Sequence, residues 1–281
     1  MPLSLEIDIE TAAAMARPAI SIAAEAGDLD ALRRELTRGV AVDLEDPSGN
    51  TALQLVCGTH NADLSLEDRI ACVKMLLEHG AAPNAGLSNH PGRSTVVTVT
   101  NFTPLMDVLF APCPRMEIAQ MLIAAGSDVN TYIPDAPSRM GHWSPLQMVV
   151  TTLPLAREFP DGLDVIDLLL KAGADPNPPE HWNQTVMEEV IEMGLRRLWP
   201  VLLRAGAVLP TRVTPYQRRE YDTNRAHPYL LRVENAGGFK AYERAHREKV
   251  LAAFTPKFAH LVPQWRVVPL IVEYAFHFGF Y

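Results

Sequence analysis

The side chains that could bind a metal or attack a substrate occur singly in this chain, not in the sets that such chemistry needs. His142 and His181, with Asp135 or Glu180, would suit a metal site only if their segments lay side by side, and such histidines more often face solvent. Cys113 is a thiol with no base beside it in the sequence, whereas a nucleophile needs a base and an orienting group. No glycine-rich phosphate loop, Gly-x-Ser-x-Gly or His-Glu-x-x-His motif is present. We therefore expect neither an enzyme nor a metal or cofactor site.

What the chain does repeat is a helix ending followed by a turn. Residues 76–84 return with the same pattern as residues 122–130 and again as residues 169–177, each with an asparagine 4 positions after a glycine. Recurrence of the same helix ending several times predicts a stack of similar units rather than a globule with a single core. Such a stack offers a surface to a partner rather than a pocket to a substrate.

A threonine or serine opens each unit, and distances from it define the repeat. The opening residue lies 29, 23, 29 and 21 residues before the glycine, and the asparagine lies 19, 14 and 8 residues before the next opening residue. The shortest of these legs give a repeat of 33 residues, and the surplus falls in connections, where a stacked core tolerates it. The opening residues are Thr51, Thr103, Ser144 and Thr185.

This motif and its spacing resemble the ankyrin-repeat family over about residues 18–210. The resemblance implies an all-α solenoid of about five helix-pair repeats with β-hairpin connectors. An upstream unit with Gly27, Gly39 and Asp43 fits the same spacing and would be the first, capping repeat. The family's Thr-Pro-Leu-His opening has lost its histidine in every unit, so the hydrogen bonds of that histidine between repeats are not carried over. The replacements are Gln54, Met106, Gln147 and Glu188.

Local signals predict where the helices begin and end. The opening threonine or serine should cap the first helix of each unit, and Pro104 and Pro145 suit a first helical turn, where no N–H is needed. The glycine after the second helix supplies the left-handed residue that ends it. One second helix shows the apolar stripe that a neighbouring repeat would cover, made of Val165, Ile166, Leu169 and Leu170.

Composition indicates an ordinary folded chain in a reducing compartment. It has 281 residues, 48% of them hydrophobic, and no apolar run of the length that spans a membrane. The N-terminus lacks a basic region before an apolar run, so we expect no secretory signal. The three cysteines form no Cys-x-x-Cys pair, and Cys57 and Cys72 fall on core-facing positions of helices. We therefore expect an intracellular protein, cytoplasmic or nuclear.

Residues 1–17 precede the repeats as an N-terminal arm. Leu3, Leu5, Ile7 and Ile9 alternate there with polar residues, a period of two. This pattern suits an extended arm that pairs with a sheet edge or a partner, and it also suits a loosely held terminus.

Residues 211–281 form a separate, helical and aromatic-rich C-terminal region. The spacing of apolar residues predicts one helix from Phe239 to Phe254 and a further element after Pro263 that restarts at Pro269. This region holds 11 basic and 6 acidic residues, a net charge of +5, whereas residues 1–210 hold 14 and 27, a net charge of −13. We interpret it as a cap that docks on the acidic stack.

Two other roles stay open for this C-terminal region. Residues 261–263 (Leu-Val-Pro) and residues 270–273 are similar to part of a helical box in adaptors that recruit targets to ubiquitin ligases. That similarity implies a second protein complex as a partner. Alternatively, the positive charge could attract an acidic partner or nucleic acid, with an affinity that falls steeply as salt rises.

The family resemblance also indicates where a partner protein would bind. The residues before each opening position stand at the hairpin tips and on the concave side in that family, and large aromatic side chains there suit an interface. Trp143 and Trp182 could instead fold back on their own hairpins. Residues 88–101 would extend one connector as a finger or an irregular excursion. The predicted partner-binding residues are Asn50, Phe102, Met140, His142, Trp143, His181, Trp182 and Gln184.

The sequence thus predicts a non-catalytic module or scaffold that binds another protein on its concave face and hairpin tips. The alternatives are an adaptor with a recruiting tail, or a binder of an acidic partner through that tail. We expect no association with a membrane, and we do not expect nucleic acid to be the partner.

Overall fold

Helices joined by turns make up the described part of the chain. The computed structural model describes residues 17–58, 64–85, 102–110, 115–131, 144–152, 162–177, 185–210 and 219–258, and no strand lies among them. The chain divides into two units, residues 1–175 and residues 176–281. No described helix has both the length and the apolar character that crossing a membrane would require.

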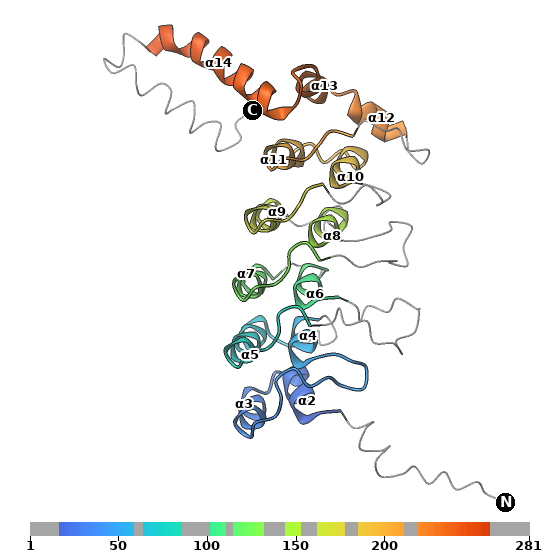
Figure 1. Ribbon diagram of the computed structural model, residues 1–281, viewed down its shortest axis with the longest axis vertical. Coiled ribbons are helices and arrows are strands. Elements are labelled where there is room, and N and C mark those ends of the chain that lie inside the picture. Colours follow the sequence, from blue (N-terminus) through green and yellow to red (C-terminus); the bar gives the residue numbers. More distant parts are fainter. Residues whose placement is uncertain are drawn as a thin grey trace, which may run out of the picture. The chain divides into compact units, whose positions relative to one another are not determined.

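The first unit is a stack of helix pairs. The first helices of successive pairs pack on one another in one row, and the second helices pack in a parallel row (Figure 1). This arrangement confirms the predicted all-α solenoid, in which each pair buries its apolar faces against its neighbours. The pairs are α2 (Ala19–Ala26) with α3 (Leu29–Thr37), α4 (Ala52–Cys57) with α5 (Leu66–Glu78), α6 (Pro104–Phe110) with α7 (Met116–Ala124), and α8 (Pro145–Thr152) with α9 (Gly162–Lys171).

The core of this stack lies between the two rows of helices. The predicted stripe on α9 is confirmed at Val165, Ile166 and Leu169, which are fully buried, whereas Leu170 is half-buried. Cys57 on α4 and Cys72 on α5 are also fully buried, as their positions predicted. The same role is played in the other pairs by Ile20, Leu32, Leu53, Val56, Val73, Leu76, Leu105, Leu109, Ile118, Leu122, Leu146 and Val150.

The opening residues cap the first helices as predicted. The Thr51 hydroxyl accepts the Gln54 N–H at 3.4 Å, and the Gln54 side chain accepts the Thr51 N–H at 2.9 Å, which completes a capping box. Ser144 and Gln147 make the same reciprocal pair. In α6 the Thr103 hydroxyl accepts the Met106 N–H at 3.3 Å. Because these helices are short, caps of about 1 kcal/mol each supply a substantial part of what holds them.

The predicted glycine endings are confirmed too. Gly80 and Gly126 have φ angles of 83° and 96°, a left-handed conformation that only glycine adopts without strain. In each case the residue after the glycine donates its N–H back to the last turn, as Ala81 does to the carbonyl of Leu76 at 3.0 Å. The helix therefore stops at the same place in every repeat.

An asparagine four residues after the glycine ties each repeat to the next. The Asn84 side chain donates to the carbonyl of Gly126 at 3.1 Å and accepts the N–H of Asp128 at 2.8 Å. Asn130 makes the same two bonds to Gly173 and Asp175, at 2.9 and 2.7 Å. In the first repeat Asp43 stands at this place and accepts the Ala82 N–H with both carboxylate oxygens. We call this row the asparagine ladder.

The second unit begins with another helix pair and continues into the C-terminal region. α12 packs against α10, and its Asn224 side chain donates to the carbonyl of Ile191 at 2.9 Å. On α11, Trp199 is buried and its indole N–H donates to the carbonyl of Val190 at 3.3 Å. The ladder recurs here, since Asn177 bonds Gly206 and Val208. The helices are α10 (Val186–Glu192), α11 (Leu198–Arg204), α12 (Arg219–Arg225), α13 (Pro228–Asn235) and α14 (Phe239–Phe258).

The helix predicted from Phe239 is therefore α14, which is 20 residues long and contains Pro256. It packs against α13 and α11. The further element predicted after Pro263 lies outside the described residues.

Candidate interaction surface

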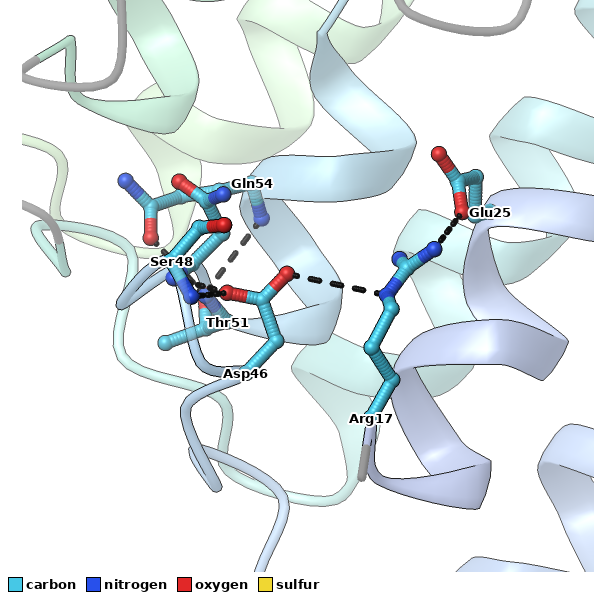
Figure 2. A network of polar contacts seen from close by, with 7 residues as sticks. Arg17, Glu25, Asp46, Ser48, Thr51 and Gln54 are labelled. Atoms are coloured by element: carbon cyan, nitrogen blue, oxygen red, sulfur yellow. Dashed lines mark hydrogen bonds and ion pairs between the residues drawn. The ribbon is translucent and has the colours of Figure 1, made fainter. Parts of the chain in front are cut away.

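The one interrepeat connector described in full is a tight turn built around Asp46. This carboxylate is buried and accepts the N–H groups of Ser48 and Asn50, both at 2.9 Å (Figure 2). The backbone closes the same turn, because the N–H of Asp46 donates to the carbonyl of Asn50 at 2.9 Å. Pro47 and Ser48 stand exposed at its tip. The turn therefore presents its tip in a fixed conformation.

Arg17 ties this turn to the first helix of the stack. Its guanidinium lies 2.6 Å from Glu25 on α2 and 3.9 Å from the second oxygen of Asp46 (Figure 2). The Arg17 side chain is 40% exposed, so the contribution of these ion pairs to the free energy of folding is small. Their effect is positional: they link the start of α2 to the connector that precedes α4.

Gln54 makes a link between repeats at the position where the repeat motif has lost its histidine. Its side-chain N–H₂ donates to the carbonyl of Phe102 at 3.1 Å, and both residues are buried. The same side chain accepts the Thr51 N–H with its oxygen, so glutamine uses its donor and its acceptor at once. The sequence shows only that the family's histidine is absent at this position, which left the link between repeats open.

Phe102, just before α6, forms an aromatic pair with Phe110, the last residue of α6. Its ring is 5.4 Å from the ring of Phe110 at 67°, an edge-to-face contact. Phe102 is only 9% exposed, whereas Phe110, at the end of α6, is 39% exposed. Phe110 was not among the predicted residues; a large apolar residue directly before Ala111-Pro112-Cys113-Pro114 in the sequence was the available signal.

Two arginines, one on α5 and one just before α7, bond carbonyls at the end of the short helix α4. Arg69 on α5 is buried and donates to the carbonyls of Val56 and Gly58, the latter at 2.9 Å. Arg115, just before α7, donates to the carbonyl of Cys57 at 2.8 Å. Carbonyls at a helix end have no partner within the helix, so these guanidinium groups satisfy them. Sequence reasoning missed both arginines.

Burial sets the ionisation of the groups near these arginines. It raises the pKa of the Cys57 thiol well above its usual range and the pKa of the Cys72 thiol to about 11. It also raises the pKa of Asp107 on α6 to about 8, against the opposing effect of Arg115. Both thiols are therefore protonated at neutral pH, which leaves them poor nucleophiles. In the described ranges, no group of three or more His, Cys, Asp and Glu is placed to hold a metal ion.

Comparison with known proteins identifies the repeat. A family model described as ankyrin repeats (3 copies) matches residues 20–133, which run from α2 through α7 into the next connector. The repeats over residues 20–133 are ankyrin repeats. The pair α8–α9, beyond the matched residues, has the same serine cap and the same ladder bonds. No curated protein matches the chain.

Ankyrin repeats indicate a protein–protein interaction module, and hence protein partners. Two of the predicted partner-binding residues, Asn50 and Phe102, lie in the described part of the chain. Asn50 lies half-buried in the Asp46 turn, and Phe102 supports Phe110 on α6. The others stay predictions outside the described residues, as do Cys113 and residues 88–101: Met140, His142, Trp143, His181, Trp182 and Gln184.

Proposed function

We propose that this ankyrin-repeat protein is a non-catalytic binding module or scaffold that holds one partner protein along its first helices and the tips of its connectors. The observation that carries this proposal is the exposed ring of Phe110, held edge-on by Phe102 at the end of a first helix. Exposed aromatic side chains are common anchors of protein interfaces, because they bring large contact area at a small entropic cost.

Burial in two of the first helices, α4 and α8, supports this placement because it leaves few of their side chains accessible to a partner. All six residues of α4 are buried, and α8 leaves only Thr151 and Thr152 half-buried at its end. In α8 the half-buried positions therefore lie at the C-terminal end, and exposed positions lie at connector tips such as Pro47 and Ser48. A partner that reads this face must contact those ends.

The matched pair Phe110→Ala and Leu163→Ala tests this proposal. Leu163 on the second helix α9 is 37% exposed, close to the 39% of Phe110, so both changes remove an equally exposed apolar side chain. We expect partners captured from lysate and identified by mass spectrometry to lose about tenfold or more in affinity for Phe110→Ala. Leu163→Ala should bind as the wild type does. If both variants bound as tightly as the wild type, the first-helix face would not be part of the interface.

The predicted tryptophans extend the same surface. We propose that Trp143 and Trp182 contact the same partner, as expected for residues that precede the opening positions in this family. The variant Trp143→Ala/Trp182→Ala should weaken binding and leave the melting temperature nearly unchanged. A large drop in melting temperature with unchanged affinity would mean that both rings pack on their own connectors.

We further propose that residues 211–281 cap the repeats instead of recruiting a second complex or nucleic acid. The packing of α12 on α10 supports this role, because α12 covers the apolar side that a further repeat would cover. The free, buried thiols of Cys57 and Cys72 suit the reducing compartment, cytosol or nucleus, that the sequence predicted.

A further inference from the structure

The outer side of α3, in the first repeat, carries a cluster of arginines. Arg33, Arg34 and Arg38 are exposed, and together with Asp30 and Thr37 they line a shallow open hollow. The opposite side of the same helix is apolar and packed against α2 and α5. The cluster is basic in a part of the chain, residues 1–210, whose net charge is −13.

The charges of this cluster are incompletely matched by neighbours. Arg38 pairs with Glu35 at 2.6 Å, with its own side chain 69% exposed. Arg34 donates its Nε–H to the backbone carbonyl of Asp30 at 3.3 Å, a bond that leaves its positive charge without a carboxylate. The Arg33 side chain makes no hydrogen bond or ion pair with any described residue, and only its backbone carbonyl accepts a side-chain donor, the Thr37 hydroxyl at 2.7 Å. The face therefore offers guanidinium groups for additional carboxylates.

The N-terminal arm has the complementary pattern. Its acidic residues are Glu6, Asp8 and Glu10, and the 16 residues before Arg17 contain no Lys or Arg. In an extended segment alternate side chains share one side and recur about every 7 Å. Arg34 and Arg38 are one helical turn apart, about 6 Å along α3. The interval between two successive carboxylates therefore matches the interval between Arg34 and Arg38.

The arm is also long enough to reach this face. The described chain begins at Arg17, which is held at the start of α2 by Glu25. Residues 11–16 can span about 20 Å when extended, whereas the axes of packed helices such as α2 and α3 lie about 8–10 Å apart. The linker therefore covers the distance from the start of α2 to the outer side of α3.

We propose that residues 3–10 of the arm dock along the outer side of α3 in the same chain, with Glu6, Asp8 and Glu10 pairing with Arg33, Arg34 and Arg38. The occupant is this acidic segment, and the contact covers the open end of the stack. Terminal repeats have a polar outer side, because no neighbouring repeat covers it, and such a side can pair with a segment of opposite charge. Each pair is exposed to solvent, so the docking is weak and falls as salt rises.

Amide hydrogen exchange of residues 3–10 in the full chain tests this docking. Rates are compared with those of a free peptide of residues 1–16 that carries the same substitutions. We expect exchange to be about fivefold slower in the chain than in the peptide at low salt. The protection should disappear in Arg33→Glu/Arg34→Glu/Arg38→Glu and return when Glu6→Lys/Asp8→Lys/Glu10→Lys is added. Lys74→Glu, an exposed reversal on α5, serves as the control and should keep the protection.

Three results would overturn the docking. Exchange in the wild-type chain at the rate of the free peptide would show an undocked arm. Protection that survives the reversal of all three arginines would place the arm on another surface. Protection that grows with protein concentration would show binding between copies of the chain instead of within one.

Discussion

At the scale of single residues, Gln54 shows how one side chain can make two contacts at the position where the family motif has a histidine. Its oxygen completes the capping box of α4, and its amide group bonds Phe102 at the start of the next first helix. Glutamine can do both because an amide carries a donor and an acceptor at fixed positions. Glu188 at the same position of a later repeat can only accept, and it completes the cap of α10 with the Thr185 N–H at 2.7 Å.

Asp107 gives the stack a dependence of stability on pH. Burial raises its pKa to about 8, whereas the carboxyl of an unfolded chain has a pKa near 3.9. The folded state therefore holds this proton more tightly than the unfolded state does. The contribution of the group to stability is complete below about pH 4 and is lost as pH rises through about 8.

We predict that Asp107→Asn removes this loss. The amide does not ionise, so at pH 8–9 the free energy of unfolding of the variant should exceed that of the wild type by roughly 1–2 kcal/mol. This figure allows for the partial exposure of Asp107. At pH 5 the two proteins should differ less. Urea unfolding of both proteins between pH 5 and pH 9 measures the difference. If the difference in the free energy of unfolding stayed constant over this range, Asp107 would not be the group that causes the pH dependence.

At the scale of elements, the first helices depend on groups outside themselves. α4 has 6 residues and α10 has 7, too few for an isolated helix to be stable in water. Caps at their starts, arginines at the end of α4 and burial on both sides make up for this. The short helices can therefore exist only inside the stack, which is why insertions fall between the helices and not within them.

The asparagine ladder couples neighbouring repeats, and Asn130 allows a test of that coupling. Asn130→Ala removes two hydrogen bonds to the α9 end of the next repeat, and we expect a loss of about 1–2 kcal/mol of stability. Asn130→Asp keeps the acceptor and loses the donor, as Asp43 does in the first repeat, so it should lose about half as much. Urea unfolding gives the totals, and exchange of the Asp175 amide reports the local bond. Equal losses in both variants would mean that the donor carries the whole effect.

At the scale of the whole molecule, the chain is a series of repeats whose ends need cover. In the second unit, α12 packs on α10, Asn224 bonds Ile191, and the ring of His227 contacts that of Trp199 at 5.4 Å. These contacts bury the side of the last repeat that would otherwise meet water. A chain that stops at residue 210 lacks all three.

We predict that removal of residues 211–281 lowers the melting temperature by several degrees and loosens the last repeat. The reason is that the stability of a repeat stack is a sum over units and interfaces, and this deletion removes one interface. Far-UV circular dichroism gives the melting temperature, and exchange of amides in α10 and α11 shows where the loss occurs. Asn224→Ala in the full chain should lose about 1 kcal/mol. A truncated chain that melts like the full one would leave the C-terminal region free for a second partner.

What the sequence determined by itself was local: the caps at Thr51 and Ser144, the left-handed glycines and the periodic apolar positions. Each of these depends on residues three or four apart, so spacing alone predicts it, and the family match and the stacked helices confirm the fold. The predicted tryptophan and histidine positions stay predictions, because they lie outside the described residues.

Only the tertiary structure decided the links between distant segments. Gln54 meets Phe102 across 48 positions and Arg115 meets Cys57 across 58, and no pattern along the chain marks such pairs. The exposure of Phe110 and the raised pKa of Asp107 likewise depend on what packs around α6. The physical reason is that a backbone pattern specifies which side of a helix is buried, whereas packing specifies which neighbour buries it.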